Sequence, residues 1–136
     1  MKTIRPITEA EIAALRAEPQ LEFEPHCVYS GAPILLPARI TRRLTPVFVG
    51  AGGYCWRVKG ASSGNGFANV SVGGLNRKVH RVVYTMLRGP IPAGHVLDHK
   101  KEAGCKFRDC ANPDHHEPVT VQINTHRGDA KLFRKP

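Results

Sequence analysis

The clearest pattern in the chain is a run of apolar residues spaced three and four positions apart between residues 79 and 87. The i, i+3, i+4, i+7 spacing places such side chains on one face of an α-helix. Gly89-Pro90 follows directly, and this pair ends a helix because proline cannot continue its hydrogen bonds. The sequence therefore predicts an amphipathic helix whose apolar face is made by Val79, Val82, Val83, Met86 and Leu87.

A shorter helix is predicted near the start of the chain. Thr8 and Glu11 have the Ser/Thr-x-x-Glu spacing of a capping box, in which the hydroxyl and the carboxylate satisfy backbone N–H groups of the first turn. Apolar residues three positions apart follow, and Pro19 stops the pattern. We expect a helix over Glu9–Ala17 that packs on the surface of the fold.

Strands are predicted in the middle of the chain. Tyr54–Lys59 alternates in the manner of a strand, and Phe67–Val72 is a second candidate across the Gly- and Ser-rich loop Gly60–Gly66. Gly73-Gly74 predicts a tight turn into a third strand, Leu75–Lys78.

Less regular stretches flank these elements. Leu21–Pro46 contains four prolines and is expected to form extended segments and turns. After the amphipathic helix, His95–His99 is predicted as a short apolar strand, and Thr120–Arg127 as a short helix. The expected fold class is α+β. We expect a small single domain in which an antiparallel β-sheet and a helix lie upstream of the C-terminal segment.

Length and composition support one domain. The chain has 136 residues and a mass of 14.9 kDa, a size that one hydrophobic core usually serves. A hydrophobic fraction of 41% excludes general disorder, and no apolar run approaches the roughly 20 residues of a membrane span. Met1–Gln20 lacks the pattern of a secretory signal, so a cytoplasmic location is expected.

The chain is strongly basic. Its formal net charge is +9, and the first 24 residues hold five acidic and three basic side chains, so the basic character belongs to the rest of the chain. A basic surface favours an anionic partner, and nucleic acid is the first candidate. The basic residues that the chain offers to such a partner include Arg39, Arg42, Arg43, Arg57, Lys59, Arg77, Lys78, Arg127, Lys131, Arg134 and Lys135.

Cysteine and histidine spacing indicates a metal site. Cys105, Cys110 and His115 are each five positions apart on a segment with turn-forming residues, and a structural Zn²⁺ needs four such ligands in a tetrahedron. Cys55 is the best candidate for the fourth ligand and Cys27 the second. Disulfides are disfavoured in a reducing compartment, and a redox thiol protein is disfavoured because the chain has no Cys-x-x-Cys pair.

A second group of residues suits hydrolysis assisted by a hard cation. Asp98-His99 ends a predicted strand, and Asn124 lies on the predicted helix that follows. A neutral imidazole can take a proton from water, while carboxylate and amide oxygens bind Mg²⁺ or Mn²⁺. From spacing alone, an Asp-His pair that only forms hydrogen bonds is the more frequent alternative.

The ordered motifs of the chain resemble those of the zinc-containing HNH endonucleases of the ββα-metal (His-Me finger) superfamily, a type common in phages and mobile introns. The resemblance covers about residues 50 to 128. It rests on Cys55-Trp56, His80-Arg81, Gly89-Pro90-Ile91-Pro92, Asp98-His99, Cys110-x-Asn112-Pro113-x-His115 and Glu117-Pro118-Val119-Thr120 ahead of Asn124.

The resemblance implies a function and roles for these residues. It implies that His99 is the general base, that Asp98 and Asn124 bind the catalytic Mg²⁺ or Mn²⁺, and that Asn112 fixes the loop. It also implies a domain division into an N-terminal extension (1–49), the nuclease domain (50–128) with a zinc-stapled ββα-metal motif, and a basic tail (129–136). The implied zinc ligands are Cys55, Cys105, Cys110 and His115, and the implied DNA contacts include Arg77, Lys78, Arg81 and Arg127.

The chain departs from the family pattern at several positions. Asn69 stands where relatives often have an Arg that meets the scissile phosphate, and Arg77, Lys78 or Arg81 could supply that charge. His116 stands where a Leu is usual. The implied partner is double-stranded DNA, with the chain acting as a monomer or homodimer and not at a membrane. The alternative is a zinc-stabilised DNA-binding module that does not cut.

Overall fold

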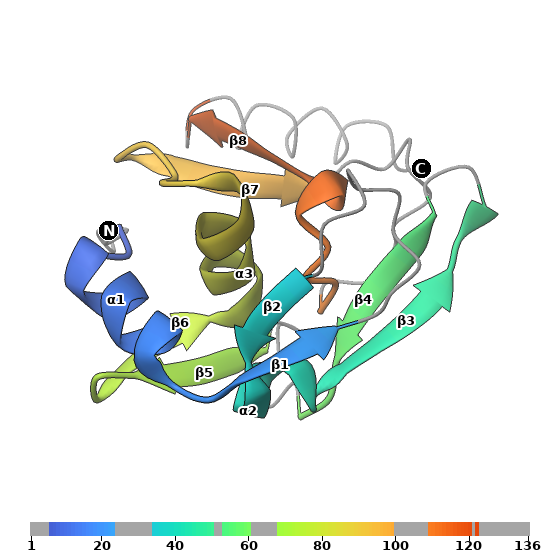
Figure 1. Cartoon of the computed structure of the whole chain (residues 1–136). Coiled ribbons are helices and arrows are strands. Elements are labelled where there is room, and N and C mark those ends of the chain that lie inside the picture. Colours follow the sequence, from blue (N-terminus) through green and yellow to red (C-terminus); the bar gives the residue numbers. More distant parts are fainter. Residues whose placement is uncertain are drawn as a thin grey trace.

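The structure is a computed structural model, and it describes residues 6–23, 34–50, 53–60, 68–99, 109–120 and 122. Short helices alternate with short strands along the described chain, which confirms the α+β class (Figure 1). The elements are α1 (Glu9–Ala17), β1 (Gln20–Phe23), β2 (Ile34–Pro37), α2 (Ala38–Thr41), β3 (Leu44–Phe48), β4 (Tyr54–Val58), β5 (Asn69–Val72), β6 (Leu75–Lys78), α3 (Val79–Arg88), β7 (His95–His99), the 3₁₀-helix η3 (Pro113–His115) and β8 (His116–Thr120).

The described strands pair as four antiparallel two-stranded ribbons: β1–β2, β3–β4, β5–β6 and β7–β8. A two-stranded ribbon is marginally stable by itself in water, so these ribbons depend on what they pack against. Figure 1 shows α3 in the middle of the molecule, with β7–β8 on one side and β5–β6 on the other. Helix α3 therefore connects the ribbon that carries Asp98-His99 to the rest of the fold.

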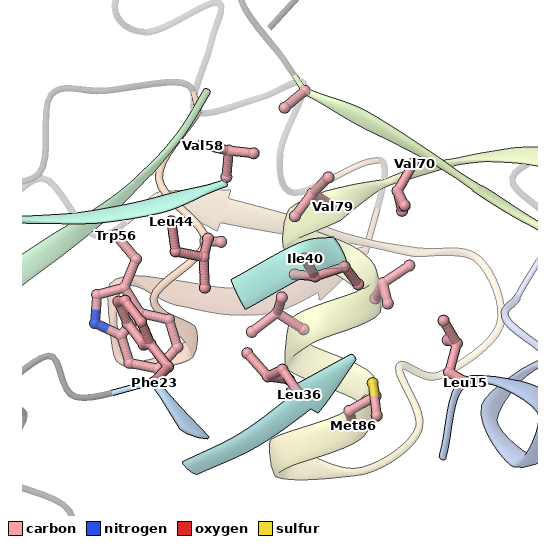
Figure 2. Packing of buried hydrophobic residues seen from close by; sticks show 14 of the residues in the cluster. Leu15, Phe23, Leu36, Ile40, Leu44, Trp56, Val58, Val70, Val79 and Met86 are labelled. Atoms are coloured by element: carbon pink, nitrogen blue, oxygen red, sulfur yellow. The ribbon is translucent and has the colours of Figure 1, made fainter. Parts of the chain in front are cut away.

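One hydrophobic cluster joins both halves of the sequence around α3. In Figure 2 the rings of Phe23 and Trp56 lie against each other, and their centroids are 4.9 Å apart in an edge-to-face arrangement. Side chains from before and after position 49 share this core, so the N-terminal segments contribute to its stability. The labelled core residues are Leu15, Phe23, Leu36, Ile40, Leu44, Trp56, Val58, Val70, Val79 and Met86.

The predicted N-terminal helix and the predicted amphipathic helix are confirmed. Helix α1 has the expected bounds, and its capping box is complete: Thr8 Oγ1 accepts from the Glu11 backbone N–H, and the Glu11 carboxylate accepts from the Thr8 N–H. Helix α3 buries Val79, Val82 and Val83, as the apolar spacing predicts.

The predicted hairpin is also confirmed. Val72 and Leu75 pair across Gly73-Gly74, whose φ values of 57° and 82° are both positive. A two-residue turn of this kind needs positive φ at both positions, which glycine adopts without strain.

Helix α2, the 3₁₀-helix η3 and strand β8 were not predicted, and each contains or adjoins a proline. Helix α2 begins directly after Pro37, inside the stretch expected to be extended. Strand β8 contains Pro118, which pairs with Leu97. Proline cannot donate to a ladder, but a two-stranded ribbon has an open edge on each strand, where a missing N–H costs little. The expected helix Thr120–Arg127 does not begin at Thr120, because this residue is the last of β8. The loop after Gly60 and nearly all of the rest of that expected helix lie outside the described residues.

Candidate functional site

Cys55, Cys110 and His115 come together in the interior of the described structure. Cys55 and Cys110 are fully buried and His115 is 1% exposed. One ligand atom from each of the three residues lies within 4.8 Å of the other two. The cluster could therefore hold a metal ion such as zinc.

The distances within the cluster fit a tetrahedral ion. His115 Nδ1 lies 3.5 Å from Cys55 Sγ and 3.6 Å from Cys110 Sγ. Zn–S bonds of about 2.3 Å and Zn–N bonds of about 2.0–2.1 Å, meeting at the tetrahedral angle, place sulfur and nitrogen about 3.6 Å apart. A single Nδ1 has one proton or one lone pair, so it cannot form two equally directed hydrogen bonds to thiols. A shared ion accounts for both contacts at once.

Backbone pairing brings the three ligands together. Cys55 lies on β4, and the segment that begins at Asp109 runs beside that strand, since Val58 N–H donates to Asp109 O and Ala111 N–H donates to Trp56 O. Cys110 thereby reaches the level of Arg57, with which it forms an isolated bridge. The turn of η3 then returns His115 to the two sulfurs.

Asn112 fixes the turn that carries His115. Its side-chain oxygen accepts from Asp114 N–H at 2.9 Å, which caps η3, and its side-chain amide donates to Tyr54 O at 2.7 Å. The side chain is 1% exposed. Both bonds are partly buried, and together they hold η3 against β4.

The fourth predicted ligand, Cys105, lies outside the described residues, as does Cys27, the second candidate from spacing. Of the pair Cys55 and Cys27, the structure brings Cys55 to Cys110 and His115. Val49 packs against the two cysteines.

Strand β8 of the β7–β8 ribbon begins directly after the cluster residue His115. Asp98 pairs with Glu117 and His99 pairs with His116 across the two strands. Asp98 is half-buried. For His99 the structure describes the backbone, which lies at the end of β7 next to the start of β8. Asn124 lies outside the described residues.

His116 connects the cluster, the ribbon and α3, a connection that sequence reasoning did not foresee. Its Nε2–H donates to Cys110 O at 2.8 Å, and its ring stacks on His80 of α3 with centroids 5.1 Å apart. The side chain is 2% exposed. Position 116 therefore ties the backbone beside the cysteine ligand to the strand pair that contains His99.

Most arginines in the described part of the chain form ion pairs or hydrogen bonds with other residues of the protein. Arg77 forms two bonds with the Glu11 carboxylate, at 2.6 and 2.8 Å, and both side chains are about nine-tenths buried. The Arg77 guanidinium is the main reason that the pKa of Glu11 falls from its ordinary value of 4.5 to about 2. Other ion pairs among the described residues include Arg39–Glu18, Arg57–Asp109 and Arg88–Asp114.

Two more arginines bond to the backbone. Arg43 donates to Lys59 O and Asn69 O, and Arg16 donates to Met86 O. Several arginines that were candidates for phosphate contact therefore form bonds between segments that are distant in the sequence. A paired arginine looks the same in the sequence as a free one, because its partner is set by the tertiary fold.

Arg81 differs from these residues. Its guanidinium donates through NH1 to His95 O at 3.2 Å, and the side chain is half-buried. Burial, followed by the nearby charge of Arg77, lowers the pKa of Arg81 from its ordinary value. Lys78 is half-buried at the N-cap of α3. Arg127 lies outside the described residues.

No helix in the described part of the chain has the length and apolar character needed to cross a membrane.

Comparisons with known proteins support the resemblance seen in the sequence. The model of the HNH endonuclease family matches residues 77–126. A search of curated proteins and a search of solved structures each gave no match. The matched segment contains Asp98, His99, Asn112 and Asn124, together with the cluster ligands Cys110 and His115, while Cys55 reaches the cluster from outside it. Residues 77–126 of this chain are therefore similar to the HNH endonuclease family.

Proposed function

We propose that the chain is a divalent-metal-dependent HNH endonuclease that hydrolyses phosphodiester bonds of double-stranded DNA. The observation that carries the proposal is the HNH endonuclease match over residues 77–126. The net charge of +9 agrees with a polyanionic substrate.

A structural zinc ion is part of this proposal. Cys55, Cys110 and His115 would bind it, and Cys105 would complete a Cys₃His set. A site closed by four protein ligands leaves no position for substrate, so this ion would contribute stability instead of chemistry. Binding would tie β4 to η3 and thereby fix the start of β8 beside His99.

A second cation would serve the reaction. Asp98 and Asn124 offer the hard oxygen ligands that Mg²⁺ and Mn²⁺ prefer. When bound there, such an ion supplies positive charge that stabilises the phosphate as negative charge develops on it.

His99 would act as the general base. A neutral imidazole accepts a proton from water, and the water oxygen then attacks phosphorus in line with the bond to the 3′ oxygen. That bond breaks, the 3′ oxygen leaves with the bonding electrons, and the product carries a 5′ phosphate. Asn112 would hold the loop behind this strand through its bonds to Asp114 N–H and Tyr54 O.

Plasmid cleavage tests the proposal. Supercoiled plasmid is incubated with the purified protein and Mg²⁺ or Mn²⁺, with and without EDTA, and nicked and linear products are measured. We expect cleavage that EDTA abolishes. His99→Ala should lower the rate by about 10² to 10⁴ while leaving DNA binding intact, since general base catalysis contributes that factor.

His95→Ala is the matched control, because His95 occupies the opposite end of the same strand. It should cut at close to the wild-type rate. Wild-type cleavage by His99→Ala would refute the role of His99. A wild-type protein that binds DNA tightly but cuts with neither cation would replace the endonuclease with a non-cleaving, zinc-stabilised DNA-binding module.

A further inference from the structure

Arg81 holds a positive charge for which the described residues provide no carboxylate. Four other arginines in the described part of the chain each pair with an Asp or Glu. The one bond of Arg81 within that part is to a neutral oxygen, the backbone carbonyl of His95, at 3.2 Å. A guanidinium has five N–H donors, so most of its hydrogen-bonding capacity is left for another partner.

The described surroundings of Arg81 are unfavourable for its charge. Arg81 is half-buried, and removing a cation from water costs free energy unless an anion compensates. The charge of Arg77 adds repulsion, and its own partner, Glu11, is already engaged by two bonds. A partly desolvated cation that the described fold does not neutralise is a feature expected of binding sites.

The position of the guanidinium indicates which part of a DNA strand it would meet. It lies at the carbonyl of His95, the first residue of β7, whereas His99 is the last residue of that strand. Four residues of extended chain separate the two ends by about 13 Å. Arg81 therefore stands well away from the strand end where cleavage is proposed.

We infer that Arg81 binds a backbone phosphate of the DNA at the His95 end of the β7–β8 ribbon, and that this phosphate is not the one that is cut. The inference rests on the proposed function for its substrate. The planar fork of a guanidinium matches two phosphate oxygens, which favours a phosphate over other anionic groups of comparable size. The bond to His95 O orients the fork before DNA arrives.

DNA binding without cleavage tests the contact directly. A fluorescein-labelled 30-base-pair duplex is titrated with protein in EDTA, and anisotropy gives Kd at several salt concentrations. Arg81→Gln should weaken binding about tenfold, and the slope of log K against log salt should become shallower by about 0.9, the value for one lost phosphate contact.

Arg16→Gln is the matched control. Arg16 also donates one side-chain bond to a backbone carbonyl, that of Met86, but it is exposed and lies on α1. The variant removes the same unit of charge and should change Kd by no more than about twofold. Equal losses in Arg81→Gln and Arg16→Gln would overturn the inference, because net charge alone would then explain them.

Cleavage kinetics separate a flanking phosphate from the scissile one. A contact made equally in the ground and transition states changes KM and leaves kcat nearly constant. We expect Arg81→Gln to raise KM about tenfold with kcat within about twofold of wild type. A large loss of kcat would overturn the flanking position. A wild-type protein that binds but does not cut would refute the endonuclease alone, and the Kd values would still decide for or against Arg81.

Thermal unfolding without DNA distinguishes binding from a structural role. Removing a charge that no described carboxylate compensates should leave the midpoint of Arg81→Gln at or above that of wild type, and a lower midpoint with unchanged Kd would overturn the inference. Should the Gln variant fail to fold, Arg81→Lys decides: weakened binding with a wild-type salt slope supports a lost bidentate contact, and wild-type affinity contradicts it.

Discussion

The metal cluster and the contact between α1 and β6 both fasten residues far apart in the sequence, but they do so by different means. Cys55 and His115 are 60 positions apart, and Glu11 and Arg77 are 66 positions apart. The cysteine cluster has Val49 as its apolar neighbour among the described residues. Helix α1 instead buries Leu15 in the main core, and Ile7 and Ile12 pack against that core.

This difference implies different vulnerabilities. Apolar burial keeps α1 in place even when its ion pair is lost, because Leu15 alone removes a full side chain from water. The turn at η3 has less apolar packing around its cysteine cluster than α1 has in the main core. Its position therefore depends on side chains that an ion would hold together. Loss of metal should therefore have a larger effect than any single change at the α1 contact.

The largest effect is expected for Cys110→Ser. It removes one thiolate from the proposed zinc site, and structural zinc contributes about 10–16 kcal/mol of apparent binding free energy in small domains. We expect loss of bound zinc, measured by atomic emission, and a strongly lowered midpoint of thermal unfolding.

Cys27→Ser is the control for that change. It should retain one zinc ion per chain and the wild-type midpoint. Zinc retention by Cys110→Ser, or zinc loss by Cys27→Ser, would show that the cluster has been assigned to the wrong sulfurs.

The next largest effect is expected for Glu11→Gln. The change leaves the mostly buried Arg77 guanidinium without its carboxylate, and hydrogen bonds to charged groups contribute about 1.5–3 kcal/mol. The free energy of unfolding in urea should fall by about 2 kcal/mol. Glu9→Gln removes the same charge from the same helical turn at an exposed position, and it should cost less than about 0.5 kcal/mol. Equal losses of stability in the two variants would mean that Glu11 stabilises the protein through the helix dipole and not through its bonds to Arg77.

The same pair predicts the acid response of the protein. Because Arg77 holds the pKa of Glu11 at about 2 against an ordinary 4.5, this contribution is complete above pH 4.5 and is lost as the pH falls from 4.5 towards 2. Urea unfolding across that range should show a steeper decline for the wild type than for Glu11→Gln. Parallel curves would contradict the lowered pKa.

A smaller effect is expected for Asn112→Ala. The change removes the cap on Asp114 N–H and leaves Tyr54 O without this donor, at a cost of about 1–2 kcal/mol. Zinc-loaded protein should lose less stability than zinc-free protein, because the ion holds η3 independently. The exposed Asn76 provides the comparison variant Asn76→Ala, for which no change beyond about 0.5 kcal/mol is expected.

The local elements of this fold were predictable because their signals are local. The capping box at Thr8, the apolar face of α3 and the Gly73-Gly74 turn each act within a few residues, and each matches the structure. In the Cys-Cys-His cluster, the spacing of Cys110 and His115 also indicates a metal site. Cys55 is distant in the sequence and had to be chosen over Cys27.

The parts of the fold and of the site that were not predicted depend on tertiary contacts, which the spacing of residues in the sequence does not encode. Arg77 resembles any other basic residue in the sequence, yet the fold assigns it to Glu11. His116 looks like a surface histidine beside another, but it is buried between Cys110 O and His80. Which residue pairs with a given side chain is decided by how whole helices and strands pack. The sequence therefore predicted candidate residues for phosphate contact, and the structure distinguished the arginines that pair with carboxylates from Arg81.

X-ray absorption at the zinc edge tests the central claim most directly, namely that a metal ion joins β4 to the η3 turn that leads into β8. The account predicts one zinc per chain with three sulfur neighbours at about 2.3 Å and one nitrogen at about 2.0–2.1 Å. A shell of oxygen and nitrogen alone, or purified and folded protein without zinc, would contradict it.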